Sequence, residues 1–404
     1  MRAASAGGLS ERTAGYAWLI LALMVSAHVS ESLVRQGLPT LAPFFQPELG
    51  LSRTQVGLFM SAMFGGAVLT AIPAGWLVDR WGIRYGLACG LGLVGLSVIL
   101  AASMQSFAHG LVLLTLTGIG HGSMNPATSR AVIVWFGARQ RATAMGLKQT
   151  GIPLGGMVAA ATLPALAVAF GWRVALVSAA VAMLVVTALV LLLCREAPRP
   201  AGGGAATLAS LPALFRHREL WILNGTSLAV AALQTATVTY LTLYFYETRA
   251  LSAVAAASFV VFANVGGVTG RVVCGIVSDR VFAGRRKPVA QMVLFSTAAG
   301  LVAMALAAPY LPLPLVALLS FALGFAVMSW TPLGMTLQGE IAGRDAVGAA
   351  VGLNSFMSNI GTLIGPPLFG AVVDATGSYQ VAWLGMAPVA LAVSLAVTLW
   401  LRGR

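Results

Sequence analysis

Charged residues and cysteines are both scarce in this chain. Only 9% of its 404 residues are charged, whereas about a quarter are charged in a typical soluble domain. Its three cysteines, Cys89, Cys194 and Cys274, lie in or beside apolar runs and show no metal-ligand spacing. The first shortage excludes an ordinary soluble domain. The second excludes a disulfide framework and a cysteine-ligated metal site, so we expect small buried cysteines and no cofactor.

Apolar residues are correspondingly abundant, at 58% of the chain, with a mean hydropathy of +0.89. Runs of about 20 apolar residues, the length that spans about 30 Å of hydrocarbon as a helix, recur along the whole sequence. We predict an all-α membrane protein with twelve transmembrane helices. The predicted spans are 14–38, 55–77, 84–104, 109–136, 145–169, 173–194, 220–245, 253–277, 288–308, 312–337, 347–373 and 381–401.

The formal net charge of +13 follows the predicted topology. If the N-terminus lies in the cytoplasm, 17 of the 24 Lys and Arg residues fall in cytoplasmic segments, and only Arg53, Arg173 and Arg249 fall in outside loops. This asymmetry is the positive-inside rule, so we expect cytoplasmic termini, a bacterial-type inner membrane and no nucleic-acid partner. The first span could alternatively be a cleavable signal peptide, but its removal would leave eleven spans.

An internal repeat divides the chain into two sets of six spans. The segment 75–80, after the second span, recurs 200 positions later at 275–280 with the same glycine, aspartate and arginine. Gly118 and Gly155 recur 206 positions later as Gly324 and Gly361. The stretch between the copies is rich in Gly, Ala and Pro, as in flexible linkers. The predicted organisation is a cytoplasmic tail 1–13, a six-helix half 14–194, a linker 195–219, a second six-helix half 220–401 and a tail 402–404.

The segment GWLVDRWGIR at 75–84 resembles motif A of the major facilitator superfamily, G-x-L-x-D-R-x-G-x-[RK]. The resemblance covers about residues 14 to 401 and implies two six-helix halves and a transporter rather than an enzyme. In that family the motif aspartate contacts the positive end of the eleventh helix and holds the cytoplasmic side shut, and the second copy contacts the fifth helix. Alternatively, the arginines only anchor the topology. The predicted gating residues are Gly75, Asp79, Arg80, Gly82, Arg84, Gly275, Asp279 and Arg280.

The first span carries His28, Glu31 and Arg35 inside an apolar run, although a charged side chain at the membrane centre costs on the order of 3 kcal/mol. At about 100° per residue the three fall within an arc of about 60°, so they face the bundle interior or a hydrated cavity. Two interpretations remain open. Glu31 and Arg35 neutralise each other as an i,i+4 pair, or at least one of them binds substrate or a proton.

Cations outnumber acids inside the predicted spans, because Arg35, Arg130, Lys148 and Arg271 face one carboxylate, Glu31. An unpaired cation in a low-dielectric site is costly unless an anion pairs with it. The pattern therefore predicts an anionic substrate, such as a carboxylate held by arginine, with Arg271 as the first candidate. Arg130 and Lys148 have a structural role as their alternative. The predicted substrate-binding residues are Arg271, Arg35, His28, Asn125, Lys148, Gln234, Tyr240, Asn264 and Asn354.

Two further segments resemble particular branches of the superfamily. Residues 118–146 resemble the anion:cation symporters, although His121 stands where that branch usually has a glutamate. GRVVCGIVSDR at 270–280 resembles the monocarboxylate and oxalate/formate carriers, with Arg271 at their substrate arginine. The two resemblances differ in branch and agree in implying transport of organic anions.

We therefore predict a monomeric secondary transporter that moves a small organic mono- or dicarboxylate across the plasma membrane by alternating access. Coupling to protons is assigned to Glu31 and His121, since both can change charge near neutral pH when buried. One alternative is a proton-driven exporter of lipophilic compounds, whose G-P-x-x-G-G motif the segment 151–156 approaches. A second alternative is a non-transporting membrane sensor. The expected partners are the anion, the proton and the lipid bilayer.

Overall fold

The computed structural model describes residues 11–136, 140–196, 217–283, 285–342 and 347–401. Within these ranges the regular secondary structure is helical and includes no strand, which confirms the predicted all-α class. The elements are α1 (Glu11–Thr40), α2 (Ala42–Glu48), α3 (Arg53–Ala101), α4 (Phe107–His121), α5 (Met124–Trp135), α6 (Arg141–Phe170), α7 (Trp172–Leu193), α9 (Arg218–Arg249), α10 (Ala253–Ile276), the π-helix η2 (Val277–Val281), α11 (Arg286–Leu306), α12 (Leu313–Ala342), α13 (Val347–Thr376) and α14 (Tyr379–Trp400).

Ten helices in the described part of the chain are long and apolar enough to cross a membrane. They correspond to ten of the twelve predicted spans. Of the remaining two, 55–77 forms the first part of α3, and 109–136 is divided between α4 and α5. The helices therefore follow the predicted order along the whole described chain.

Gly82 interrupts α3 and divides it into the second and third predicted spans. Its backbone has φ 91° and ψ 175°, a conformation that a residue with a Cβ rarely adopts. The carboxylate of Glu196 occupies the space where a Cβ would lie, and its Oε1 accepts a hydrogen bond from the Arg84 N–H at 2.6 Å. Gly82 therefore lets the chain turn between the second and third spans while Glu196 caps the start of the third.

Pro126 accounts for the division of the fourth span into α4 and α5. Because proline has no N–H, it cannot donate the helical hydrogen bond to the carbonyl of Gly122. The chain turns there, α4 ending at His121 and α5 beginning at Met124. The tenth span carries Pro332 at the matching repeat position, yet α12 continues through it. The break is thus particular to the first half, and it leaves His121 at the end of a helix.

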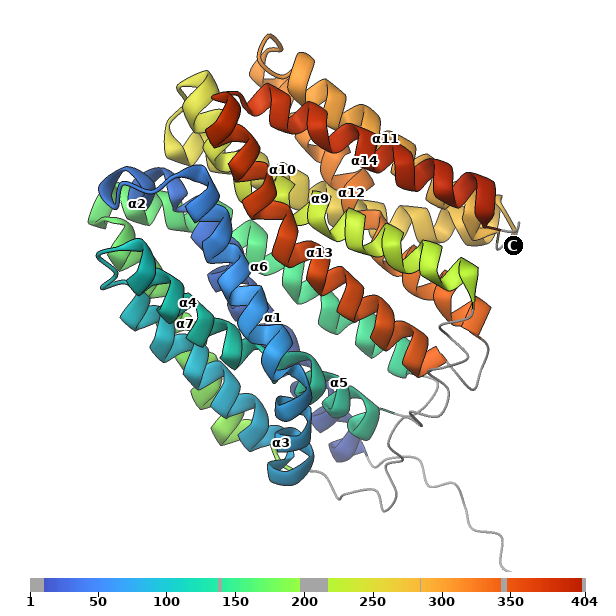
Figure 1. Ribbon diagram of the computed structural model, residues 1–404. Coiled ribbons are helices and arrows are strands. Elements are labelled where there is room, and N and C mark those ends of the chain that lie inside the picture. The colour runs from blue at the N-terminus through green and yellow to red at the C-terminus, as the bar shows by residue number, and fades with distance from the viewer. Residues whose placement is uncertain (1–10, 137–139, 197–216, 284, 343–346, 402–404) are drawn as a thin grey trace, which may run out of the picture.

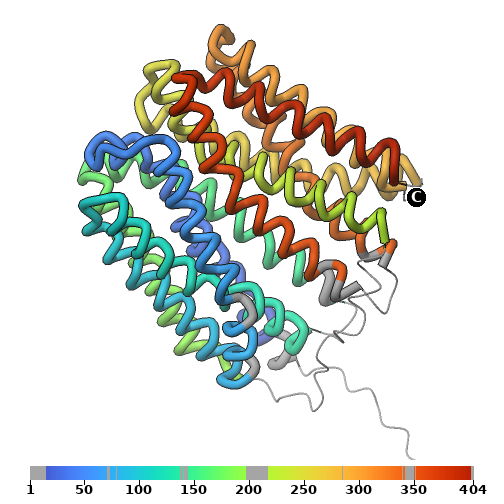
Figure 2. The backbone as a smooth tube through the Cα atoms, in the orientation of Figure 1, coloured from blue at the N-terminus to red at the C-terminus, as the bar shows by residue number. Residues whose placement is uncertain are grey.

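The helices gather into two bundles, blue to green through α7 and yellow to red from α9 (Figure 1; the same path is traced as a tube in Figure 2). Across the bundles, α3 packs against α13 and α6 against α10. Following the predicted topology, we call the end that holds α2 the outer end and the end that holds Gly82 the inner end.

The repeated glycines occupy equivalent helix contacts in the two halves. A Cβ on Gly155 would clash with the α1 backbone, and one on Gly361 with the α9 backbone. Likewise, a Cβ on Gly118 would meet the α3 backbone and one on Gly324 the α10 backbone. The first and fifth helices of each half, and the second and fourth, therefore approach closely through the same repeat positions.

Candidate functional site

Two adjoining cavities lie between the halves. The central cavity has a volume of about 320 Å³, and the inner cavity, which extends toward the inner end, has a volume of about 820 Å³. Both are lined by helices from the two halves. The residues that line both cavities are Arg35, Phe64, Asn125, Ile152, Met335, Ser355 and Asn359.

Two guanidinium groups face the central cavity, Arg35 from α1 and Arg271 from α10. Arg271 Nε donates to the carbonyl oxygen of Met328 at 3.3 Å, and no carboxylate among the described residues forms an ion pair with this guanidinium. The Arg35 guanidinium lies 5.4 Å from the centre of the Phe64 ring. Since two like charges in one cavity repel each other, an anion between them would be stabilised by both.

Glu31 is the one carboxylate among the described residues that line these cavities. Its Oε1 lies 3.2 Å from Arg35 Nε and 3.3 Å from His121 Nε2. The i,i+4 pair foreseen as one alternative does form, but the same oxygen also faces His121. The Glu31 side chain is only 6% exposed and that of His121 8%, whereas that of Arg35 is 24% exposed. Arg35 is therefore the member of the group that reaches the cavity most openly.

Lys148 lies behind the cavity wall rather than in it. It is fully buried, and its Nζ donates to Thr128 Oγ1 at 3.2 Å and to Ser129 Oγ at 2.9 Å. His28, which lines the inner cavity, contacts the same Thr128 oxygen through Nε2 at 3.2 Å. The predicted substrate contact of Lys148 is therefore not formed in this conformation, because α5 stands between its ammonium group and the cavity.

Amide side chains surround the central cavity. The predicted residues Asn125, Gln234, Asn264 and Asn354 all line it. The sequence pattern did not single out Gln36, whose Oε1 accepts from Asn264 Nδ2 at 3.2 Å and so joins α1 to α10. Its signal was available, since Gln36 follows Ser32 by one helical turn on the flank of the polar face.

Tyr240 is not brought to either cavity, although it was predicted to bind substrate. It is fully buried, stacks on Phe369 with ring centres 4.7 Å apart, and donates its hydroxyl to the carbonyl oxygen of Arg53. The preceding residue, Thr239, lines the central cavity, but the Tyr240 side chain projects from a different face of α9. Its hydroxyl reaches the start of α3 at the outer end, where it supports the contacts described next.

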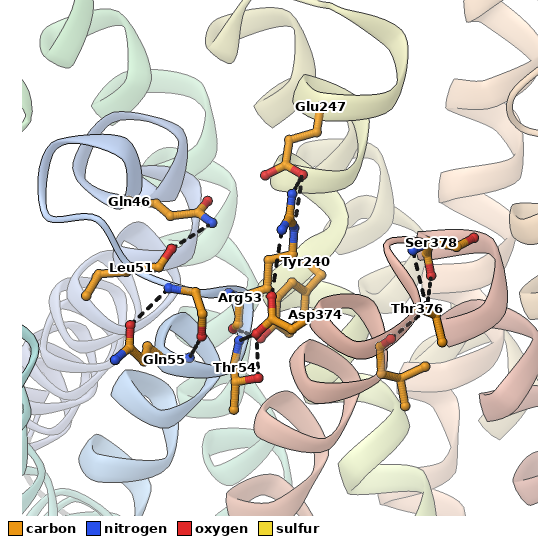
Figure 3. A network of polar contacts seen from close by, with 12 residues as sticks. Gln46, Leu51, Arg53, Thr54, Gln55, Tyr240, Glu247, Asp374, Thr376 and Ser378 are labelled. Atoms are coloured by element: carbon orange, nitrogen blue, oxygen red, sulfur yellow. Dashed lines mark hydrogen bonds and ion pairs between the residues drawn. The ribbon is translucent and has the colours of Figure 1, made fainter.

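The outer end is closed by polar contacts between the halves, which we call the outer seal: Arg53 and Thr54 of α3, Glu247 of α9 and Asp374 of α13. Arg53 Nη2 lies 2.8 Å from Glu247 Oε2, and its Nη1 lies 3.7 Å from Asp374 Oδ1 (Figure 3). Asp374 also accepts the N–H groups of Arg53 and Thr54, at 3.0 and 2.8 Å. A carboxylate at the first turn of α3 is stabilised by that helix's positive end.

At the inner end, the described ion pair of the predicted gating residue Asp279 lies within the second half. Asp279 Oδ1 lies 3.4 Å from Arg286 Nη1, and Arg286 Nε lies 2.8 Å from Glu340 Oε1. All three belong to the second half, so these contacts of Asp279 do not reach the fifth helix. The guanidinium of Arg80 lies over the Trp76 ring, 5.4 Å from its centre.

The remaining predicted gating residues show no described contact between the halves. The Arg84 guanidinium lies over Tyr85 at 5.3 Å, Arg280 is exposed, and neither Gly75 nor Gly275 makes a contact that would clearly exclude a side chain. The side chain of Asp79 and the residues 343–346 before α13 lie outside the described part of the structure. The predicted contact between the motif aspartate and the eleventh helix therefore stays a prediction.

The Major Facilitator Superfamily model matches residues 24–331 and 283–404 of this sequence. The chain belongs to the Major Facilitator Superfamily. It is therefore an integral, multi-pass membrane transporter rather than an enzyme, as predicted.

Similar proteins extend over nearly the whole chain. A hexuronate transporter of Bacillus subtilis is 28% identical over 95% of this chain and 94% of its own length. A probable sulfoacetate transporter, SauU, of Cupriavidus necator is 24% identical over 91% and 89%. The crystal structure of a bacterial homologue of the human lysosomal transporter Spinster, in an inward-facing and occupied conformation, aligns with a TM-score of 0.80 at 15% identity over 97% of both chains. That structural likeness confirms the fold.

Proposed function

We propose that this transporter moves a small organic anion with a carboxylate group, coupled to protons. The observation that carries the proposal is the convergence of Arg35 and Arg271, from opposite halves, on the central cavity, whose described lining includes no carboxylate. Glu31 lines the adjoining inner cavity. A bound carboxylate would be attracted by both positive charges and could accept hydrogen bonds from both guanidinium groups. An anion held by both halves also couples substrate binding to their relative movement.

The rest of the lining favours a hydroxylated acid over a plain fatty acid. A cavity of about 320 Å³ suits a small metabolite, and its uncharged polar groups can exchange hydrogen bonds with substrate hydroxyls. The hexuronate named for one relative is a hydroxylated acid, whereas the sulfoacetate named for another is a small acid without a hydroxyl group. The amide and hydroxyl residues of the lining are Gln36, Asn125, Ser227, Gln234, Thr235, Thr239, Asn264, Thr331, Asn354, Ser355, Ser358, Asn359 and Thr362.

The two alternatives fit the cavity less well. A lipophilic cation, a common cargo of drug exporters, would be repelled by Arg35 and Arg271 and would find only Glu31 to pair with. A sensor that does not transport would bind an anion without moving it across the membrane. Transport separates the proposal from the sensor, and the charge of the cargo separates it from the exporter.

The test is uptake into proteoliposomes of radiolabelled D-glucuronate, D-gluconate and sulfoacetate, with and without an inward proton gradient. We expect counterflow of at least one of these acids, and faster uptake with the gradient. Arg271→Gln should reduce uptake at least tenfold, because a charged hydrogen bond contributes about 1.5–3 kcal/mol. The matched control is Arg173→Gln, at the exposed outer surface, which should transport normally. Uptake of lipophilic cations and of no acid would contradict the proposal.

A further inference from the structure

One oxygen of Glu31 lies close to two side chains. One of them is always charged, and the other is charged only when it binds a proton. Arg35 Nε lies 3.2 Å from Oε1 and is always charged, whereas His121 Nε2 lies 3.3 Å from the same oxygen and is charged only when protonated. The Glu31 and His121 side chains are both more than nine-tenths buried. Water therefore cannot easily replace either contact, and the state of His121 decides how strongly Glu31 is held.

The geometry of the imidazole fixes where its protons lie. His121 Nδ1 is 2.8 Å from the carbonyl oxygen of Thr117, which can only accept, so Nδ1 carries a hydrogen. A neutral ring then presents a lone pair at Nε2 to the Glu31 carboxylate, and the two repel. Contact becomes favourable when one further proton lies between Nε2 and Oε1. The Glu31–His121 pair is thus a site for one proton.

The charged groups around the Glu31–His121 pair determine the charge that Arg35 presents to the cavity, with and without the extra proton. Arg35 and His28 face it from α1, and Arg271 from α10 contributes positive charge to the shared cavity. Lys148 of α6 lies behind Thr128, and the α5 and α13 residues of the inner cavity wall are uncharged. Without the extra proton, Glu31 neutralises Arg35. With it, His121 neutralises Glu31, and Arg35 keeps a full positive charge facing the cavity.

We propose that the Glu31–His121 pair binds the coupled proton, and that this proton releases Arg35 from Glu31 so that Arg35 can hold the substrate anion. The inference rests on the proposed function. It adds an order of binding, proton before anion, and a reason for histidine at position 121. When the proton leaves, Glu31 returns to Arg35 and competes with the anion, which promotes release.

This mechanism predicts opposite effects for the two members of one pair. In Glu31→Gln, Arg35 has no internal competitor, so anion binding should be tight and independent of pH. In His121→Gln, Glu31 stays on Arg35 at every pH, so binding should be weak and independent of pH. The double variant should behave like Glu31→Gln, because without the Glu31 charge the state of residue 121 no longer matters. A merely structural pair would instead weaken binding in both single variants.

The experiment measures binding and counterflow of radiolabelled D-glucuronate, D-gluconate and sulfoacetate by purified protein between pH 5.5 and 8. We expect the parent to bind at least tenfold more weakly at pH 8 than at pH 5.5. At pH 8, Glu31→Gln should bind at least tenfold more tightly than the parent. At pH 5.5, His121→Gln should bind at least tenfold more weakly. The matched controls are Glu48→Gln and His109→Gln, at exposed positions near the ends of α2 and α4, which should keep the parent's pH profile.

The outcomes separate this inference from the proposed function. If the parent binds one of the acids but both single variants keep its pH dependence, or both lose binding alike, the proton switch is wrong and anion transport stands. A double variant that resembles His121→Gln would also overturn the switch. If the parent binds none of the acids and transports none, the proposed function fails and the switch with it.

Discussion

The two ends of the molecule use their charges differently. At the outer end, Arg53 of the first half binds Glu247 and Asp374 of the second half. At the inner end, the described contacts of Asp279 run to Arg286, within the second half. Movement of one half against the other would therefore break charged contacts at the outer end while leaving this inner contact intact. The difference indicates that the outer seal is what holds this conformation closed to the outside.

The outer seal also suggests that both ends are closed by the same kind of contact, a carboxylate at the N-terminal end of a helix. Asp374, near the end of α13, lies on the N-terminal turn of α3. The predicted inner contact has the reverse arrangement, with Asp79 of α3 on the start of the eleventh helix, α13. The same two helices would then supply a carboxylate at one end and a positive helix end at the other, with exchanged roles. Each conformation would be held by one of these two contacts.

Among the substitutions that test this difference between the two ends, Asp374→Asn should change the outward-open population most. The amide keeps the shape of the side chain but removes its charge and weakens its contacts with Arg53 and the α3 helix end. A charge-assisted hydrogen bond contributes about 1.5–3 kcal/mol, so the outward-open population should rise at least tenfold. The measurement is maleimide labelling of a Ser61→Cys reporter beneath the seal, in protein whose native cysteines are replaced. Unchanged labelling would show that the seal does not hold the outer end closed.

Glu247→Gln should have a smaller effect in the same direction. The Arg53–Glu247 pair is partly exposed, with side chains 35% and 22% accessible, and such pairs contribute about 0.2–1 kcal/mol. We expect labelling of the Ser61→Cys reporter to rise by up to about fivefold. An effect as large as that of Asp374→Asn would mean that the ion pair, and not the helix cap, dominates the seal.

Asp279→Asn should change labelling in the opposite direction. The aspartate makes no described contact across the halves here, so its loss should not open the outer end. If it joins the fifth helix when the inner end closes, its removal should disfavour the outward-open state and reduce reporter labelling, by up to about twofold. Increased labelling would remove the distinction between the two ends.

The smallest effect concerns an ion pair at the outer surface that lies within one half. Hydrogen bonds from the Trp172 indole and the Arg173 guanidinium lower the pKa of Glu48 below its ordinary value of 4.5. A lowered folded-state pKa stabilises the protein above pH 4.5, and this stabilisation is lost as pH falls through the folded value. At pH 7, Glu48→Gln should reduce stability by less than about 1 kcal/mol, and at pH 3 by a smaller amount.

Thermal unfolding of the parent and of Glu48→Gln at both pH values checks this prediction. Labelling of the Ser61→Cys reporter should be the same with and without the substitution, because the pair does not join the halves. A Tm difference as large at pH 3 as at pH 7 would show that the charge of Glu48 is not its cause.

The fold was more predictable from sequence than the site. Span length and hydropathy report burial in lipid directly, and helix order therefore follows from local rules. The positive φ of Gly82, where the chain turns between the second and third spans, was not predicted. Polarity within a span predicts which face looks inward, and it correctly placed Arg35, Arg271 and Asn264 at the cavity. It does not fix the direction of each side chain: Thr239 lines the central cavity, whereas its neighbour Tyr240, which was predicted to bind substrate, reaches the outer seal.

Contacts between segments that lie far apart in the sequence could not be predicted from local sequence patterns. Arg53 and Asp374 are 321 positions apart, near the ends of helices in different halves, so their pairing depends on how the halves dock. Lys148 is one position from the cavity residue Gln149, yet its side chain lies on the other side of α5. In both cases the packing of helices from different parts of the chain decides the partner.

A structure of the protein with D-glucuronate, or whichever of the tested acids it transports, tests the central claim most directly. The account predicts the carboxylate between the guanidinium groups of Arg35 and Arg271, with the remaining oxygens near the amides of the central cavity. It would be contradicted if both guanidinium groups were bound to protein acceptors while the acid lay elsewhere.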